Sequence, residues 1–266
     1  MRWEQQQWEE EYMSFVSDDS FPSSLSELDY FSVDLFEKHC PVFKAYFAFD
    51  NFPFNDNSVI QVLRERNMLG YCEAVLDSSN TQIKRVDIAL SNRTPSNMST
   101  LYKCLSQTSP AFHQIESEVS KLNESITSGC AEESAMYHLG LGLQGEIIST
   151  VKCYFNVAKC HKRHLPVLEI APFSALSGIT EQLLSFEESR PWMVGIDGGK
   201  NRKYKIYIRH FGDSLWQVID TLGTAISAQA YDLMNWLKLH KEFFYTGIAV
   251  CLNEQSEFSA NLYFMT

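Results

Sequence analysis

The sequence predicts an α+β fold: an antiparallel β-barrel of repeated αββα units, with the helices wrapped outside. The first observation is a short strand signature that returns four times, each time as the second half of an expected β-hairpin. Its copies span residues 84–90, 150–156, 203–209 and 260–265. Their spacing of roughly 53 to 65 residues leaves room in each unit for one or two helices. Closing the hairpins into a barrel removes exposed strand edges, and outer helices then bury the outward-facing apolar residues.

The N-terminal residues 1–40 are expected to be lead-in helices of a single domain that spans residues 1–266. Apolar residues recur at helical spacing in 3–16 and 25–39. Asp56 is expected to cap a short helix that reaches Asn67. Residues 42–47 echo the strand signature and are a candidate for a degenerate fifth strand, but they lie too close to Asp87 for a full unit. The way in which the barrel closes is therefore left open.

Four hairpins follow, with helical stretches between them. The expected hairpins span residues 68–91, 136–157, 192–209 and 243–265. The expected helices span residues 97–107, 111–127, 173–188 and 212–240, where apolar residues share one helical face. The adjacent glycines of Asp197-Gly-Gly-Lys200 are the strongest turn signal in the chain.

Composition narrows the class of protein. A chain of 266 residues that is 45% hydrophobic can bury a sizeable core as one large domain. Its net charge of -11 argues against nucleic acid or an anionic membrane as the main partner. No apolar run is long enough for a membrane span, and the N-terminus is charged where a signal peptide would be apolar. Seven cysteines without framework spacing fit reduced thiols, so a cytoplasmic protein is expected.

The strand signature predicts a polar and aromatic working face. Alternate residues of a strand share one face. Three copies therefore pair a polar with an aromatic side chain: Lys152 with Tyr154, Lys205 with Tyr207, and Asn261 with Tyr263. Buried ammonium groups are costly unless they are paired or hydrated, so lysines inside the barrel imply a solvated chamber that binds an anion. Lysines facing outward would instead favour a non-catalytic barrel that binds a small molecule or a partner protein.

Several of these segments resemble the soluble aromatic prenyltransferases built on the ABBA prenyltransferase barrel. The resemblance rests on Arg85-Val-Asp-Ile-Ala-Leu-Ser91, on the Lys-x-Tyr strands at 152–155 and 205–208, and on residues 245–250 and 260–264. It implies a ten-stranded barrel that transfers a dimethylallyl or geranyl group from an allylic diphosphate. The implied acceptor is a small phenol, naphthalene, phenazine or indole of secondary metabolism. Some members hold Mg²⁺ with an aspartate that looks like Asp87, others need no metal, and no organic cofactor is implied.

The proposed chemistry suits these residue types. Ionisation of the allylic C–O bond gathers negative charge on the diphosphate, which preorganised cations stabilise. Candidates for those cations are Lys152 and Lys205, with Arg209 or Lys200. Tyrosines can donate hydroxyl hydrogen bonds to the diphosphate, and their rings can stabilise an allylic cation by about 0.5 to 2 kcal/mol per contact. The candidate tyrosines are Tyr154, Tyr207 and Tyr263.

Two further assignments complete the expected site. Glu73 and Asp197, expected on the first strands of their hairpins, are candidate bases for the acceptor's proton, and Asn261 takes the place of lysine in the last copy of the signature. Prenylation of a peptide side chain on the same fold is an alternative, which a wide barrel mouth would favour.

Overall fold

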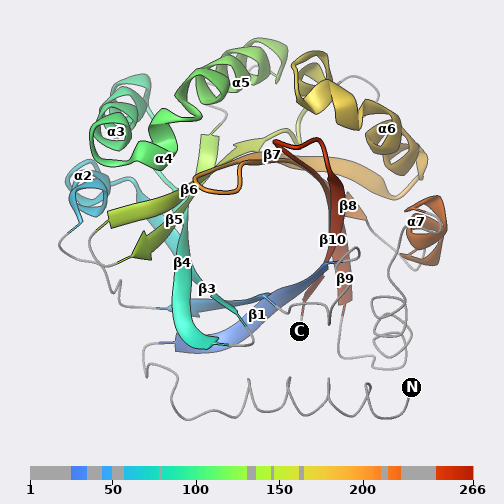
Figure 1. Cartoon of the computed structure of the whole chain (residues 1–266), viewed down its shortest axis with the longest axis horizontal. Coiled ribbons are helices and arrows are strands. Elements are labelled where there is room, and N and C mark those ends of the chain that lie inside the picture. Colours follow the sequence, from blue (N-terminus) through green and yellow to red (C-terminus); the bar gives the residue numbers. More distant parts are fainter. Residues whose placement is uncertain are drawn as a thin grey trace.

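The computed structural model is a closed barrel of ten antiparallel strands with helices around its outside (Figure 1). It describes residues 25–34, 44–49, 57–77, 80–130, 136–144, 147–161, 165–210, 215–222 and 244–265. The strands are β1 (Leu25–Asp34), β2 (Lys44–Phe49), β3 (Leu69–Asp77), β4 (Asn80–Leu90), β5 (Met136–Gln144), β6 (Ile147–Asn156), β7 (Ser189–Gly198), β8 (Lys203–His210), β9 (Phe244–Asn253) and β10 (Phe258–Met265).

The helical layer covers the barrel between successive hairpins (Figure 1). Its α-helices are α2 (Ser58–Glu65), α3 (Pro95–Thr108), α4 (Pro110–His113), α5 (Glu116–Cys130), α6 (Ser177–Ser185) and α7 (Leu215–Leu222). Two 3₁₀ helices, η1 (Pro166–Glu169) and η2 (Phe173–Leu176), precede α6. The predicted helix at 111–127 is split into α4 and α5. The prediction for 3–16, and that for 212–240 beyond α7, lie outside the described residues.

The barrel closes by pairing its first strand with its last. Every other pair joins strands that are neighbours in the sequence, and β1 pairs with β10 from Tyr30↔Met265 to Asp34↔Asn261. The predicted fold class is therefore confirmed, and the fifth hairpin that the repeat spacing left open is β1–β2. Residues 42–47 overlap β2, as their likeness to the strand signature predicted.

The expectation that residues 1–40 are lead-in helices is wrong for 25–34, which form β1. Two register shifts, between Leu25 and Leu28 and between Leu28 and Tyr30, interrupt the pairing of β1 with β2. An irregularity of this kind breaks the two-residue alternation of a strand and spaces apolar residues three apart, which imitates a helix. Because β1 pairs with strands on both sides, it also satisfies the backbone hydrogen bonds at the edges of β2 and β10. This stabilises the strand over the helix that the local apolar pattern indicates.

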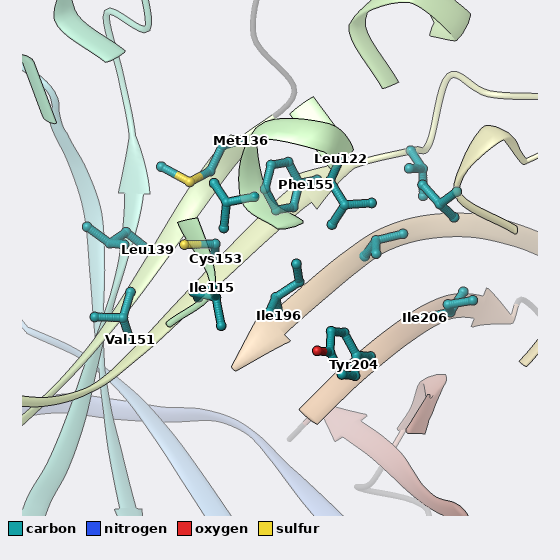
Figure 2. Packing of buried hydrophobic residues seen from close by; sticks show 14 of the residues in the cluster. Ile115, Leu122, Met136, Leu139, Val151, Cys153, Phe155, Ile196, Tyr204 and Ile206 are labelled. Carbon is teal, nitrogen blue, oxygen red and sulfur yellow. The ribbon is translucent and has the colours of Figure 1, made fainter. Parts of the chain in front are cut away.

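The main hydrophobic core lies between the barrel and the helices. It takes the outward-facing residues of strands β4 to β10, such as Cys153 and Phe155 of β6 and Ile196 of β7. Figure 2 shows them beside Ile115 and Leu122 of the helical layer. With this set facing outward, the alternate residues of the same strands must face into the barrel.

Helix and strand ends differ from the predictions by a few residues. The first described helix, α2, is capped by Asn57, whose Oδ1 accepts from the backbone N of Val59 at 2.9 Å, and not by Asp56 as predicted. The strand β7 continues through Asp197 and Gly198, so the turn starts at Gly199, whose φ of 123° suits glycine. Asp197 is therefore a strand residue and not part of the turn.

Cysteine oxidation also departs from expectation. Cys72, Cys104, Cys153 and Cys251 are free thiols, whereas Cys160 is bonded in a disulfide. The expectation that all seven cysteines are reduced is wrong for Cys160, and the cysteine content no longer argues for a reducing compartment. Within the described ranges, no helix combines the length and the apolar character that crossing a membrane requires.

Candidate active site

Charged residues, interrupted by one glycine, form a row along the inside of the barrel from β3 to β8. Directly opposed residues on successive strands run Glu73, Asp87, Gly140, Lys152, Asp197 and Lys203, from β3 to β8. Their sequence neighbours, such as Val86 and Ile196, belong to the outer core. The row is thus the lumen side of the sheet, and it places both candidate bases in line with a candidate lysine.

Two lysines meet on one carboxylate oxygen. The Nζ atoms of Lys152 and Lys205 lie 2.7 and 2.6 Å from the same Oδ2 of Asp197. Burial alone raises the pKa of Asp197, but the charges and hydrogen bonds of the two lysines outweigh it and hold the pKa well below 3.8. Burial likewise lowers the pKa of Lys205, and Asp197 reverses this to a net rise. Asp197 and Lys205 therefore remain charged inside the barrel.

A second ion pair lies beside the first. Arg85 donates from Nε to Oδ1 of Asp87 at 2.6 Å and from Nη2 to Oδ2 at 2.7 Å. This two-point pairing needs Gly140 on the next strand, because a Cβ there would collide with Asp87 Oδ1. Both carboxylate oxygens already accept from Arg85. Among the described residues no three His, Cys, Asp or Glu side chains cluster as metal ligands. Mg²⁺ usually takes one or two protein carboxylates and completes its shell with waters and substrate phosphates, so Mg²⁺ at Asp87 stays a prediction.

An aromatic layer adjoins the charged row. The rings of Tyr154 and Tyr207 lie 6.0 Å apart, and those of Tyr207 and Tyr263 lie 5.7 Å apart. The ring of Trp192 lies 6.3 Å from that of Tyr207. Burial, and then the neighbouring tyrosines, raise the pKa of Tyr207 well above 10.0. Its hydroxyl therefore stays protonated and can donate a hydrogen bond.

Charged and aromatic groups meet at a small cavity of about 30 Å³. Its walls include Glu73, Asp87, Trp192 and the three tyrosines, and Met193 and His138 complete the lining. The His138 ring stacks on Tyr137 with centroids 4.5 Å apart. Burial lowers the pKa of His138 below 6.5; Asp87 opposes this shift and Arg93 adds to it. The imidazole is therefore neutral at neutral pH and offers one donor and one acceptor.

The other predicted residues occupy different places. The guanidinium of Arg209 lies 4.4 Å from the centroid of the Trp192 ring, a cation–π contact at an exposed position. Oδ1 of Asn261 lies 3.8 Å from the Sγ of Cys251. Lys200 is exposed in the turn between β7 and β8, and its position gives no support to a role in substrate binding.

Sequence reasoning missed several of the residues that meet here. Arg85 belongs to the segment 85–91 on which the family resemblance rests, but no role was predicted for it. No role was predicted for His138 or Trp192 either. The two-residue alternation of the strands could have identified Arg85 and His138. Once the register is known, both lie on the same face of the sheet as Asp87 and Tyr154. Asp197 was expected on the first strand of its hairpin, which β7 confirms, but its place opposite Lys152 was not recognised.

Comparisons with known proteins identify the fold. Neither a family model nor a curated protein matches the sequence. Among solved structures, NotF prenyltransferase in complex with brevianamide F and DMSPP has a TM-score of 0.56 at 13% identity, covering 92% of this chain and 82% of that one. A second NotF structure gives 0.52, also at 13% identity, over 89% and 80%.

A bacterial enzyme gives the same result. The 5-dimethylallyltryptophan synthase from Streptomyces coelicolor has a TM-score of 0.53 at 11% identity, covering 88% of this chain and 79% of that one. At such low identity the likeness concerns the arrangement of the backbone. The chain therefore has the prenyltransferase-barrel fold that the sequence predicted.

Proposed function

We propose that this chain is an aromatic prenyltransferase that moves a dimethylallyl or geranyl group from an allylic diphosphate to a small electron-rich aromatic. The observation that carries the proposal is the meeting of two kinds of group inside the barrel. Lys152 and Lys205 present ammonium groups, and the adjoining layer of Tyr154, Tyr207 and Tyr263 presents aromatic faces. A reaction that separates a diphosphate anion from an allylic cation needs both.

The reaction divides between these groups. The allylic C–O bond breaks and its electron pair leaves with the diphosphate, whose growing charge Lys152 and Lys205 stabilise. The tyrosine rings face the allylic cation and exclude water from it. The acceptor ring then forms the new bond, and its proton passes to a base. Glu73 is our candidate, because its side chain is buried in the cavity wall beside the aromatic layer.

An indole is the acceptor class to test first. NotF was solved with brevianamide F, and another structural neighbour is a dimethylallyltryptophan synthase. The neutral His138 beside Tyr154 offers a hydrogen-bond partner for a ring N–H. We propose that Asn261 and Arg209 also contact substrate. Mg²⁺ shared between Asp87 and the diphosphate stays a prediction, and Arg85 competes for both Asp87 oxygens.

The balance of charge in the lumen favours one alternative function, a non-catalytic barrel that binds a small molecule. Asp87 and Asp197 pair with Arg85, Lys152 and Lys205, so the inner cations are largely neutralised. A non-catalytic barrel that binds a small molecule would need no free positive charge. Prenylation of a peptide side chain stays a prediction.

Product formation decides between these functions. The full chain is incubated with dimethylallyl or geranyl diphosphate and with tryptophan, brevianamide F, a dihydroxynaphthalene or a tryptophan-containing peptide. Mass spectrometry then detects addition of one prenyl group. We expect product with an indole acceptor, and loss of nearly all of it in Lys205→Ala. Absence of product with every pair of substrates would favour the non-catalytic barrel, and product with the peptide alone would favour the peptide enzyme.

A further inference from the structure

Asp197 holds the two lysines in the place where, under the proposed function, the diphosphate binds. Its Oδ2 accepts from both Nζ atoms, at 2.7 and 2.6 Å. The side chains of Lys152, Lys205 and Asp197 are only 14%, 10% and 8% exposed. An anion that enters the barrel to reach these ammonium groups must therefore approach a buried carboxylate of its own sign.

The two carboxylates of the charged row differ in how completely they are bonded. Asp87 uses both oxygens, one for each of two Arg85 nitrogens. Asp197 uses Oδ2 twice, whereas its Oδ1 is buried and, within the described part of the chain, accepts no hydrogen bond. A buried acceptor without a donor is costly, so Asp87 is a completed structural pair and Asp197 is not.

We propose that Asp197 is a built-in counter-anion that competes with the diphosphate for Lys152 and Lys205. Before the diphosphate binds, it keeps the two ammonium groups together. When the diphosphate binds, at least one ammonium transfers from Asp197 Oδ2 to a phosphate oxygen. This inference rests on the proposed function, because it takes the lysine pair as the diphosphate site.

The exchange is chemically reasonable for these side chains. A lysine ammonium carries three donors on a flexible stem, so it can change acceptors without a change in the backbone. Diphosphate offers more charge and more acceptor oxygens than one carboxylate. Repulsion between Asp197 and the diphosphate weakens binding and also weakens retention of the pyrophosphate that is left after transfer. Asp197 is thus a positioning residue that sets how long the leaving group stays.

Calorimetric titration with inorganic pyrophosphate tests the inference. The proteins are the wild type, Asp197→Asn, and Glu118→Gln as a control that removes one charge from an ion pair between α5 and Arg202. We expect Asp197→Asn to bind pyrophosphate at least about tenfold more tightly, because a like charge has gone, and Glu118→Gln to match the wild type. A purely structural role would give weaker binding in Asp197→Asn.

The outcomes separate the two claims. If the wild type binds pyrophosphate and Asp197→Asn binds it equally or more weakly, the counter-anion role of Asp197 is wrong. The proposed diphosphate site would not be affected by that result. Absence of pyrophosphate binding in the wild type and in Asp197→Asn would overturn both claims.

A crystal structure of the wild type with pyrophosphate gives a test that does not depend on the folding of the variant. We expect at least one Nζ–Oδ2 separation to lengthen beyond hydrogen-bond range, and retention of both at 2.7 and 2.6 Å would overturn the inference.

Discussion

Lys152 and Lys205 show how the barrel keeps ammonium groups charged away from bulk water. Isolated buried charges are costly, and a buried pair is tolerated when opposite charges and hydrogen bonds are close. Asp197 supplies both for two lysines at once. The same arrangement that allows cations in the lumen also reduces their net charge.

The pKa of Asp197 predicts a dependence of stability on acid. Its pKa lies below the ordinary 3.8 in the folded chain, so its ionised form stabilises the fold above that pH and this contribution is lost as the pH falls. We expect the wild type's free energy of unfolding to drop between about pH 4 and pH 2, and Asp197→Asn to show a smaller drop over the same window.

Urea denaturation at several pH values measures both slopes, with Glu118→Gln as the control. At neutral pH, Asp197→Asn should itself be less stable by about 3 to 5 kcal/mol, because two buried ammonium groups lose their partner. Equal acid slopes in wild type and Asp197→Asn would contradict the assigned ion pair.

Tyr207 separates the packing role of the aromatic layer from its hydroxyl role. Tyr207→Ala removes a ring that is 3% exposed and should cost about 3 to 5 kcal/mol of stability, as large-to-small core changes do. Tyr207→Phe keeps the ring and should cost about 1 kcal/mol, yet weaken binding of an allylic diphosphate analogue. Thermal unfolding and calorimetry measure the two effects. Equal diphosphate affinity in Tyr207→Phe and wild type would remove the hydroxyl from the site.

Among the secondary-structure elements, the hairpins could be predicted from the sequence. Which residues face one another across paired strands could not. Alternating strands with glycine turns indicate a hairpin from the sequence itself, and this brought Lys152, Lys205 and the tyrosines to one face. Which residues meet across strands depends on register, which a bulge or a displaced turn alters by one or two residues. The Asp197–Lys152 pair and the strand β1 were missed for this reason.

The packing of the helices on the barrel predicts opposite effects at two glycines. A Cβ on Gly198 of β7 would collide with the backbone oxygen of Ala111 in α4, whereas one on Gly178 of α6 meets nothing within 4 Å. We expect Gly198→Ala to destabilise the chain by about 1 to 3 kcal/mol through overpacking. Gly178→Ala should stabilise it by about 0.5 kcal/mol through helix propensity. Chemical denaturation compares them, and a neutral Gly198→Ala would contradict the contact between α4 and β7.

At the scale of the whole molecule, closure of the barrel is what isolates the lumen. The pairing of β1 with both β2 and β10 leaves no strand edge among the ten described strands. A closed sheet of this size has room for a chamber lined by inward side chains, and the helices complete its hydrophobic exterior. The repeat of four units in the sequence predicted a barrel, and the fifth unit was hidden by the irregular register of β1.

Closure predicts that β1 tolerates proline poorly. Ser32 pairs with Tyr263 on one side and Lys44 on the other, so its backbone N–H points to a neighbouring strand in either direction. Proline has no N–H and would leave a ladder acceptor unpaired. We expect Ser32→Pro to be less stable than Ser32→Ala by about 2 kcal/mol or more in urea denaturation. Similar stability of the two variants would mean that β1 is an open edge.

Under the proposed function, the lumen binds an allylic diphosphate through Lys152 and Lys205. Calorimetric titration with dimethylallyl and geranyl thiolo-diphosphates, which resist ionisation, tests it most directly. The proteins are wild type, Lys152→Ala, Lys205→Ala and the control Lys121→Ala on the exposed face of α5, each with and without Mg²⁺. We predict binding that either lumen substitution abolishes, that Lys121→Ala preserves and that does not require Mg²⁺. Absence of binding in the wild type under both conditions, or binding indifferent to Lys152 and Lys205, would contradict the account.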